Sequence, residues 1–311
     1  MSAGTRGLLL AALVAAALPA RAHVVFERTS LREWLTRSAL VVVAEFESDV
    51  EMWSAPDGSD RQEFFRVRVL ETLKGPAPAS PLEFFPHAEG FPRFQAGDRA
   101  LLFLERSDAR REFAALATRF PWFSVQGAGH EWRLAPGAEG ARVLATARRW
   151  LALRGDAPSD PIGAVRSLLV DQLGSEVPAL RADAVAELVR MRELPGFLDD
   201  EGVAAFAPFT TSPALSIGQR LALVRLLDGG PGFDPNPALR ALAVEARSGS
   251  NAELAQTIRA AAASDDPALQ TWLAELADDE RTWVRRAARE ARTDAVLRAR
   301  QPAPETTTGT P

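Results

Sequence analysis

The chain has 311 residues, of which 47% are hydrophobic and 25% charged, and it contains no cysteine. This length suffices for two ordinary domains, and the composition is that of a globular protein. The net charge of −5 argues against a general nucleic-acid binder, which needs a basic face. Without cysteine, the chain has no disulfide, no thiolate metal site and no cysteine nucleophile.

The first 22 residues have the pattern of a secretory signal peptide. Arg6 precedes an apolar run at Leu8–Leu18, and residues 20–22 form a small-residue cleavage box. The run is shorter than the roughly 20 apolar residues that span a bilayer, so we expect a cleaved signal and no membrane anchor. Removing this segment, which carries two arginines and no acid, takes the net charge from −5 to −7. We predict a periplasmic or extracellular protein, cleaved near Ala22, whose mature chain begins at His23.

Residues 23–137 contain the short, partly alternating apolar runs that are typical of β-strands. A short helix is expected before the first strand, at Leu31–Leu35. Thr29 or Ser30 is its expected N-cap, and Glu33, three residues after Ser30, completes a capping box.

The clearest strand begins at Phe65 and ends in the turn at Lys74 and Gly75, with apolar residues on one face and two arginines on the other. Further strands are expected at residues 40–46, 82–85, 100–105, 120–125 and 131–134. The run at 100–105 is apolar enough to be buried on both faces. Five or six short strands separated by glycine turns favour a small closed or half-closed barrel.

Two motifs in these strands carry a resemblance to a known family. One is the Leu-x-x-Leu-Lys-Gly sequence formed by Leu70, Leu73, Lys74 and Gly75, and the other is the Gly-Asp-Arg-x-Leu-Leu-Phe-Leu sequence that begins at Gly97. Together they resemble a widespread domain of bacterial secreted proteins, similar to the OB-fold of netrin modules and of tissue inhibitors of metalloproteinases. The resemblance covers about a third of the chain and implies an OB-like barrel. We interpret these residues as structural, and Lys74, the only lysine, as an exposed turn residue.

The mature N-terminus is a candidate metal site. In the animal inhibitors that this domain resembles, an N-terminal cysteine binds the zinc of the target protease and disulfides brace that segment. Here the expected N-terminal residue is His23, whose amine and imidazole are potential metal ligands. A metal site would need further ligands, so a chance cleavage before a histidine is the alternative. The other histidines are His87 and His130, and nothing in the sequence shows that they converge.

Four aromatic residues of this half are candidates for a ligand groove, namely Phe84, Phe85, Trp122 and Phe123. OB-folds stack sugars or single-stranded nucleic acid on such rings. The alternative, which we favour, is that these rings form the core of the barrel.

After residue 137 the hydrophobic period changes from 2 to 3.6, which indicates a domain boundary and a helical second half. A first helix follows the boundary, and further helices are expected at residues 161–173, 178–194, 213–227, 237–247, 252–263, 267–276 and 281–298. Segments that begin at Leu180 and Val284 resemble the second helix of a HEAT repeat. We therefore predict a HEAT-like repeat domain over residues 138–301, with an irregular α bundle as the alternative. The Pro- and Thr-rich tail at 302–311 is expected to be disordered.

These elements predict an α+β chain with two domains, a small OB-like β-barrel over residues 23–137 followed by an all-α domain of HEAT-like repeats. An esterase elbow, a His-Glu-x-x-His helix, a phosphate loop and a dinucleotide fingerprint are all absent from the sequence. Since the chain has three histidines, no cysteine and no tyrosine, we expect neither an enzyme nor a bound cofactor.

Two functions remain open from the sequence alone. The first is an exported protein-binding or scaffold module, which captures another protein through the surface of its helical repeats. The alternative is an inhibitor of metalloproteases, or a metal-binding protein, that acts through His23 and the rim of the barrel.

Overall fold

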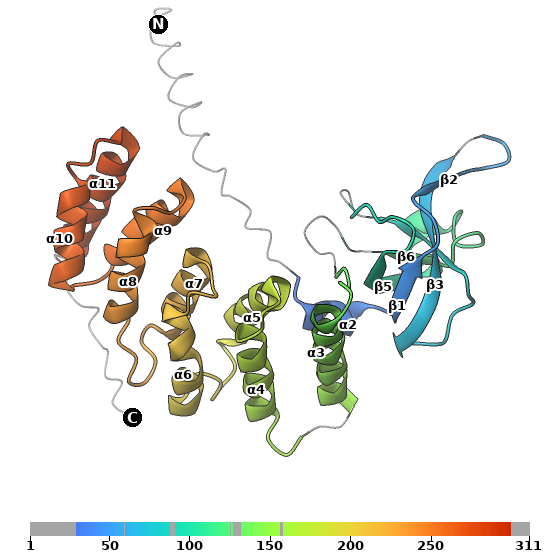
Figure 1. Cartoon of the computed structure of the whole chain (residues 1–311), viewed down its shortest axis with the longest axis horizontal. Coiled ribbons are helices and arrows are strands. Elements are labelled where there is room, and N and C mark those ends of the chain that lie inside the picture. The colour runs from blue at the N-terminus through green and yellow to red at the C-terminus, as the bar shows by residue number, and fades with distance from the viewer. Residues whose placement is uncertain are drawn as a thin grey trace, which may run out of the picture.

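The computed structural model describes residues 29–58, 60–87, 91–124, 126, 132–155 and 158–299, with side chains described up to residue 293. A closed five-stranded β-barrel lies at one end of the molecule, and a row of helices extends from it (Figure 1). The predicted α+β architecture of a small barrel followed by a helical region is thereby confirmed.

The structure contains five expected strands, which form the barrel, and a further strand at Glu51–Ser54 that was not expected. They are β1 (Leu40–Phe46), β2 (Glu51–Ser54), β3 (Arg61–Lys74), β4 (Leu82–Pro86), β5 (Arg99–Arg106) and β6 (Trp122–Ser124). The strands pair in the order β1-β5-β6-β4-β3, and pairing of β3 with β1 closes the barrel. The pairing of β4 with β6 is parallel, and the other strand pairs are antiparallel. A five-stranded barrel with non-consecutive strand pairing is compatible with an OB-fold, which is a five-stranded Greek-key barrel.

The outer part of the barrel differs from expectation at two places. β2 pairs only with the first half of β3, so these two strands form a hairpin that projects from the barrel (Figure 1). The strand predicted at 131–134 is reduced, in its described part, to one isolated bridge between Arg133 and Ala100. The chain then turns at Gly137 into the first long helix.

The apolar strand β1 is buried on both faces because its two faces contribute to two different cores. Leu40, Val42 and other even-numbered positions point into the barrel, whereas Val41 and Val43 pack against helices outside it. β5 alternates in the same way, so the prediction that its run is buried on both faces is confirmed.

Among the described residues, one α-helix precedes the barrel and the other α-helices lie between residues 138 and 299. They are α2 (Leu31–Arg37), α3 (Ala138–Gly155), α4 (Pro161–Leu173), α5 (Pro178–Met191), α6 (Asp200–Phe206), α7 (Ile217–Leu227), α8 (Asn236–Ala246), α9 (Asn251–Ala261), α10 (Pro267–Leu276) and α11 (Thr282–Ala299). From α4 onward, α4 packs with α5, α8 with α9 and α10 with α11, while α7 packs on the short 3-10 helix Ala207–Thr211 that follows α6. These units stack side by side (Figure 1). One layer contains α5, α7, α9 and α11, and the other contains α4, α6, α8 and α10. We call this stack the helical array.

Two details of the helical array depart from the sequence prediction. The short helix α6 was not expected, since its seven residues include Gly202 and do not show a helical period. The helix expected from residue 213 begins only at Ile217, because Ser216 and Gln219 form a capping box at that point.

The barrel and the helical array share one hydrophobic core. A single buried cluster includes Trp34 of α2, Val43 of β1, Phe103 of β5, Trp150 of α3 and Leu188 of α5. α2 therefore lies between the two parts and contributes to the packing of both. Among the described residues, no helix has both the length and the apolar character that a membrane span requires.

Candidate functional site

Lys74, at the end of β3, caps the C-terminus of α2. Its ammonium group donates hydrogen bonds to the carbonyl oxygens of Leu35 and Thr36 at 2.9 Å each and of Ser38 at 2.5 Å. These are carbonyls that a helix end leaves without intrahelical donors, so a cation is favoured there. Burial, together with the nearby charge of Arg154, lowers the pKa of Lys74. The expectation of a merely exposed turn lysine was wrong, because the turn packs onto a helix that lies far away in the sequence.

The other residues of the Leu-Lys-Gly motif surround the same contact. Gly75 has φ +89°, and a Cβ there would overlap the carbonyl oxygen of Ala39. Leu73 packs against the shared core, whereas Leu70 is 40% exposed on the outer wall of the barrel. Gly97 also has a positive φ, +88°, but open space surrounds it. Glycine is therefore required at residue 75 by backbone conformation and by space, and at residue 97 by conformation alone.

The four aromatic candidates lie in two separate cores. Phe84 and Trp122 belong to the interior of the barrel, and Phe85 and Phe123 belong to a second cluster on its outer side. All four are buried, the most exposed being Trp122 at 7%. The structure thus places them in contact with other core side chains and not along an open groove.

The histidine candidates are not brought together in the described part of the chain. His23 and His130 lie outside the described residues. His87 is half exposed, with its Nε2 4.0 Å from Glu112 and its ring against Phe113 and Phe123. Among the described residues, no group of three or more His, Asp or Glu side chains is arranged to hold a metal ion.

A groove of about 810 Å³ lies where the barrel meets the start of α3, and we call it the junction groove. Its apolar walls include Val43, Leu70, Leu134 and Leu144. Domain junctions are frequent places for ligand sites, so its polar groups decide what it can bind.

The charges at the rim of the junction groove are already paired within the chain. Glu45 accepts hydrogen bonds from Arg68 at 2.6 Å and from Arg99 at 2.9 Å, and both hydrogen bonds lower its pKa. Asp98 is paired with Arg133. The junction groove therefore presents apolar surface framed by charged side chains that are already paired within the described residues.

A second hollow, of about 560 Å³, lies at the edge of the helical array where successive helix pairs are joined. We call it the array cleft. It is bounded by the ends of α7 and α9 and by the starts of α8 and α10. Its floor includes the apolar residues Val224 and Leu239, and charged residues of both signs surround that floor.

Four charged residues of the array cleft are available to a partner. Arg225 and Arg259 come from the last turns of α7 and α9, while Asp228 and Asp265 come from the loops that follow these helices. All four are exposed. Within the part of the chain that the structure describes, no ion pair or side-chain hydrogen bond engages any of them. The sequence analysis did not single out these residues, since only the stacking of two helix pairs brings them to one cleft.

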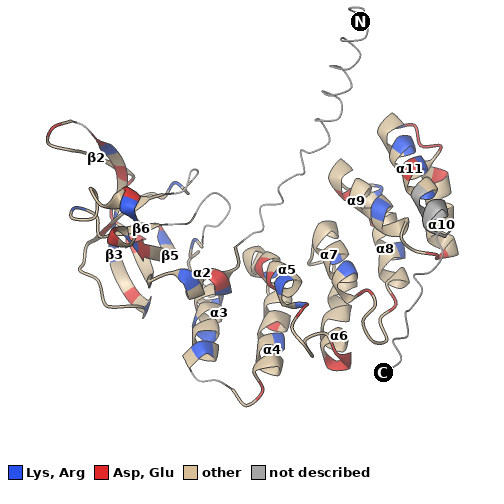
Figure 2. Cartoon of the chain, turned by 180° about the vertical axis from the view of Figure 1, so that it is seen from behind, with Lys and Arg blue, Asp and Glu red and all other residues tan. Residues whose placement is uncertain are grey.

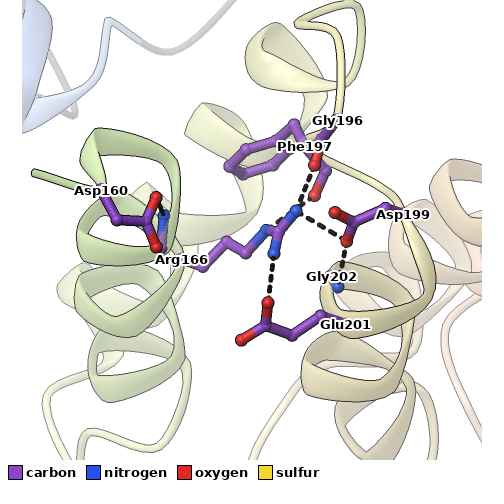
Figure 3. Close-up of polar contacts among 8 residues, drawn as sticks. Asp160, Arg166, Gly196, Phe197, Asp199, Glu201 and Gly202 are labelled. Carbon is purple, nitrogen blue, oxygen red and sulfur yellow. Dashed lines mark hydrogen bonds and ion pairs between the residues drawn. The ribbon is translucent and has the colours of Figure 1, made fainter.

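Arg166 of α4 links this helix to the segment that contains the start of α6. Its guanidinium donates to the carbonyl oxygen of Phe197 at 3.0 Å, to Asp199 at 2.7 Å and to Glu201 at 3.2 Å, and also to the carbonyl of Gly196 (Figure 3). The side chain is only 7% exposed. Because its donors are engaged by the loop before α6 and by the first turn of α6, Arg166 is a structural clasp and not a ligand site.

The architecture defines the class of the protein as an OB-like barrel joined, through a shared core, to an array of helix pairs. Comparison of the chain with known protein families, with curated proteins and with solved structures found no match.

Proposed function

We propose that the protein is an exported, non-enzymatic module that binds another protein through its helical array. The observation that carries the proposal is the array cleft, where four charged side chains of both signs surround an apolar floor and have no partner within the described chain. Stacked helix pairs bury their apolar faces against their neighbours and leave a long continuous surface, which such proteins use to hold other proteins.

The finer sequence resemblances are part of this proposal. The helical array is proposed to be HEAT-like, on the motifs that begin at Leu180 and Val284. The barrel is proposed to be related to the domain shared with netrin modules and tissue inhibitors of metalloproteinases, on the motif that ends at Gly75. Export is proposed on the pattern of residues 1–22.

The proposal is tested by photo-crosslinking capture from a native envelope extract with the intact chain. Deleting the array would expose the side chains of α2 that pack in the shared core, so surface variants are used instead. One array variant is R225E/R259E, and a second is V189D/L194D, which adds charge at two exposed apolar positions on and just after α5. The control outside the array is M52D, at an exposed position of strand β2 in the β2–β3 hairpin.

The proposal predicts that a discrete partner is captured by the wild type and by M52D. At least one array variant should recover it about tenfold less, the loss expected when one strong contact worth about 1.4 kcal/mol is removed. If the partner is lost with M52D but kept by both array variants, the binding surface lies on the barrel side and not on the array. The absence of any crosslinked partner would remove the proposal altogether.

A further inference from the structure

The array cleft suggests the chemistry of the segment that it binds, an inference that rests on the proposed function. Three successive helices of one layer carry an arginine in the last turn: Arg190 in α5, Arg225 in α7 and Arg259 in α9. In α7 and α9 the arginine lies nine residues after the serine of a capping box, Ser216 or Ser250, so the two positions are equivalent in their helices.

The chain itself shows how such a last-turn arginine is engaged. Glu33 of α2 pairs with Arg190 at 2.7 Å, and its neighbour Arg32 pairs with Glu187 of α5 at 2.6 Å. Figure 2 shows acidic and basic residues together on both helices. The helix α2 thus docks on the array through an adjacent base and acid, which pair with an acid and a base on α5. The Glu187 carboxylate is buried in this contact, which makes the pair more than a solvated surface contact.

The charges of the array cleft exclude several other kinds of ligand. Asp228 and Asp265 would repel a polyanion such as a nucleic acid, although Arg225 and Arg259 would attract it. The two arginines oppose a cation in the same way. A volume of about 560 Å³ falls in the range of about 300–1,000 Å³ that suits a small ligand or a few residues of a peptide.

We propose that the array cleft binds a short segment of a partner protein that carries one acidic and one basic side chain beside a small apolar residue. The acidic side chain pairs with Arg225 and Arg259, since a guanidinium and a carboxylate form strong, directional hydrogen bonds. The basic side chain pairs with Asp228 or Asp265. The apolar residue covers the floor at Val224 and Leu239.

The test is a selection of random heptapeptides displayed on phage against the intact chain, each flanked by glycine and serine so that neither end of the peptide is charged. The inference predicts enrichment of peptides that contain both an acid and a base, and little enrichment of peptides with charges of one sign. The best peptide is then synthesised with blocked ends, and its binding is measured by fluorescence anisotropy.

Two charge reversals of the cleft locate the contact. R225E/R259E should weaken binding of this peptide about tenfold or more, and so should D228K/D265K, because each leaves a like charge in place of a pair. Replacing the peptide's acid by lysine should restore binding to R225E/R259E and not to the wild type. The control is R192E/R286E, which changes the net charge equally at two exposed arginines outside the cleft. Both cleft variants should stay folded, since none of the four cleft side chains has a partner to lose within the described chain and a reversed charge in the last turn of a helix costs only about 0.3–1 kcal/mol.

Several results would overturn the inference. The first three are a selection without a mixed-charge pattern, no enriched peptide at all, and equal binding by the cleft variants and the wild type. The fourth is a dimer of the wild-type chain that dissociates in R225E/R259E, because the cleft would then bind a second copy of the chain. If the partner capture described above succeeds while the selection shows no charge pattern, this inference fails and the proposed function stands. If a mixed-charge peptide binds the cleft but no partner is captured, the proposed function fails instead.

Discussion

The carboxylate of Asp183 on α5 accepts a 2.6 Å hydrogen bond from the backbone N–H of Leu31, the first residue of α2, across 152 positions of sequence. Both residues are fully buried. The N-terminal turn of a helix carries N–H groups without intrahelical acceptors and a partial positive charge, so a carboxylate from elsewhere in the chain can cap it. This contact fixes α2, and with it the barrel, to the helical array.

Replacing Asp183 by alanine is expected to lower the free energy of unfolding by about 1–3 kcal/mol, because the buried N–H of Leu31 loses its acceptor. D183N keeps a carbonyl oxygen and should cost less. Urea unfolding, followed by tryptophan fluorescence and by circular dichroism, measures both losses. Equal stability of D183A and D183N would show that the hydrogen bond contributes nothing.

Gly75 and Gly97 form a matched pair, because both have φ near +90° but differ in the space around them. G97A should cost about 1 kcal/mol, the strain of a left-handed backbone conformation in a residue with a Cβ. G75A should cost clearly more than about 2 kcal/mol, since its methyl group would also displace the backbone at Ala39. Thermal and urea unfolding of the two variants provide the comparison. Similar losses would mean that the turn at residue 75 does not press against the backbone at Ala39.

Lys74 is expected to stabilise α2 through the three carbonyl oxygens that its ammonium group contacts. K74M keeps the aliphatic part of the side chain and removes the donors, and a loss of about 1–2 kcal/mol is expected. Hydrogen exchange should show the larger change in α2 and not in the distant helix α10. A uniform change across the chain would contradict a local capping role.

The Arg166 clasp predicts that R166M costs about 1–3 kcal/mol, because the carbonyl oxygen of the buried residue Phe197 loses its donor and the exposed carboxylate of Asp199 loses its charged partner (Figure 3). The control is R149M, which removes a 2.5 Å pair with Asp171 between two half-exposed side chains. Surface pairs of that kind contribute about 0–1 kcal/mol. Limited proteolysis of R166M should cut first in the loop before α6. Equal losses in the two variants would refute the assignment of Arg166 as a clasp.

Asp279 lies between α10 and α11 and is the acidic residue whose pKa is most clearly lowered among the described residues. Hydrogen bonds from the side chain and the backbone N–H of Arg281 lower its pKa from 3.8 to about 2. Because the folded chain then binds the proton less tightly than the unfolded chain, the stabilisation is complete above pH 3.8 and is lost as the pH falls through about 2.

The difference in urea midpoint between the wild type and D279N should therefore be present above pH 3.8 and shrink towards pH 2. Direct titration of the Asp279 carboxyl carbon by NMR gives its pKa. A titration at or above 3.8 would contradict the hydrogen bonds to Arg281.

Much of the barrel could be predicted from local signals. β1 at Leu40–Phe46 has its predicted bounds, because a run of β-branched and apolar residues followed by polar residues marks a strand without reference to its neighbours. The helices α4 and α10 also have their predicted bounds, since an aspartate cap followed by proline starts a helix locally. These signals depend on residues a few positions apart, and they are therefore present in the sequence itself.

The sequence did not reveal which of these elements meet. In the sequence, Lys74 is simply a lysine in a turn before a glycine. Its role depends on α2, whose C-terminal carbonyl oxygens lie 36 to 39 residues earlier. α6 was missed because its seven residues show no helical period of their own, and part of what holds them is Arg166 from another helix.

The array cleft also arises from contacts between elements that lie far apart in the sequence. Arg225 and Asp265 are ordinary charged residues in the sequence, and they become one site only when the α7–α8 and α9–α10 connections lie side by side. Most of the strands, most of the helices and the α+β class follow from the sequence, because local conformational preference and hydrophobic periodicity act over a few residues. The tertiary structure alone decided the shared core, the caps on α2 and the pairing or non-pairing of each charge, because those depend on contacts between residues far apart in the chain.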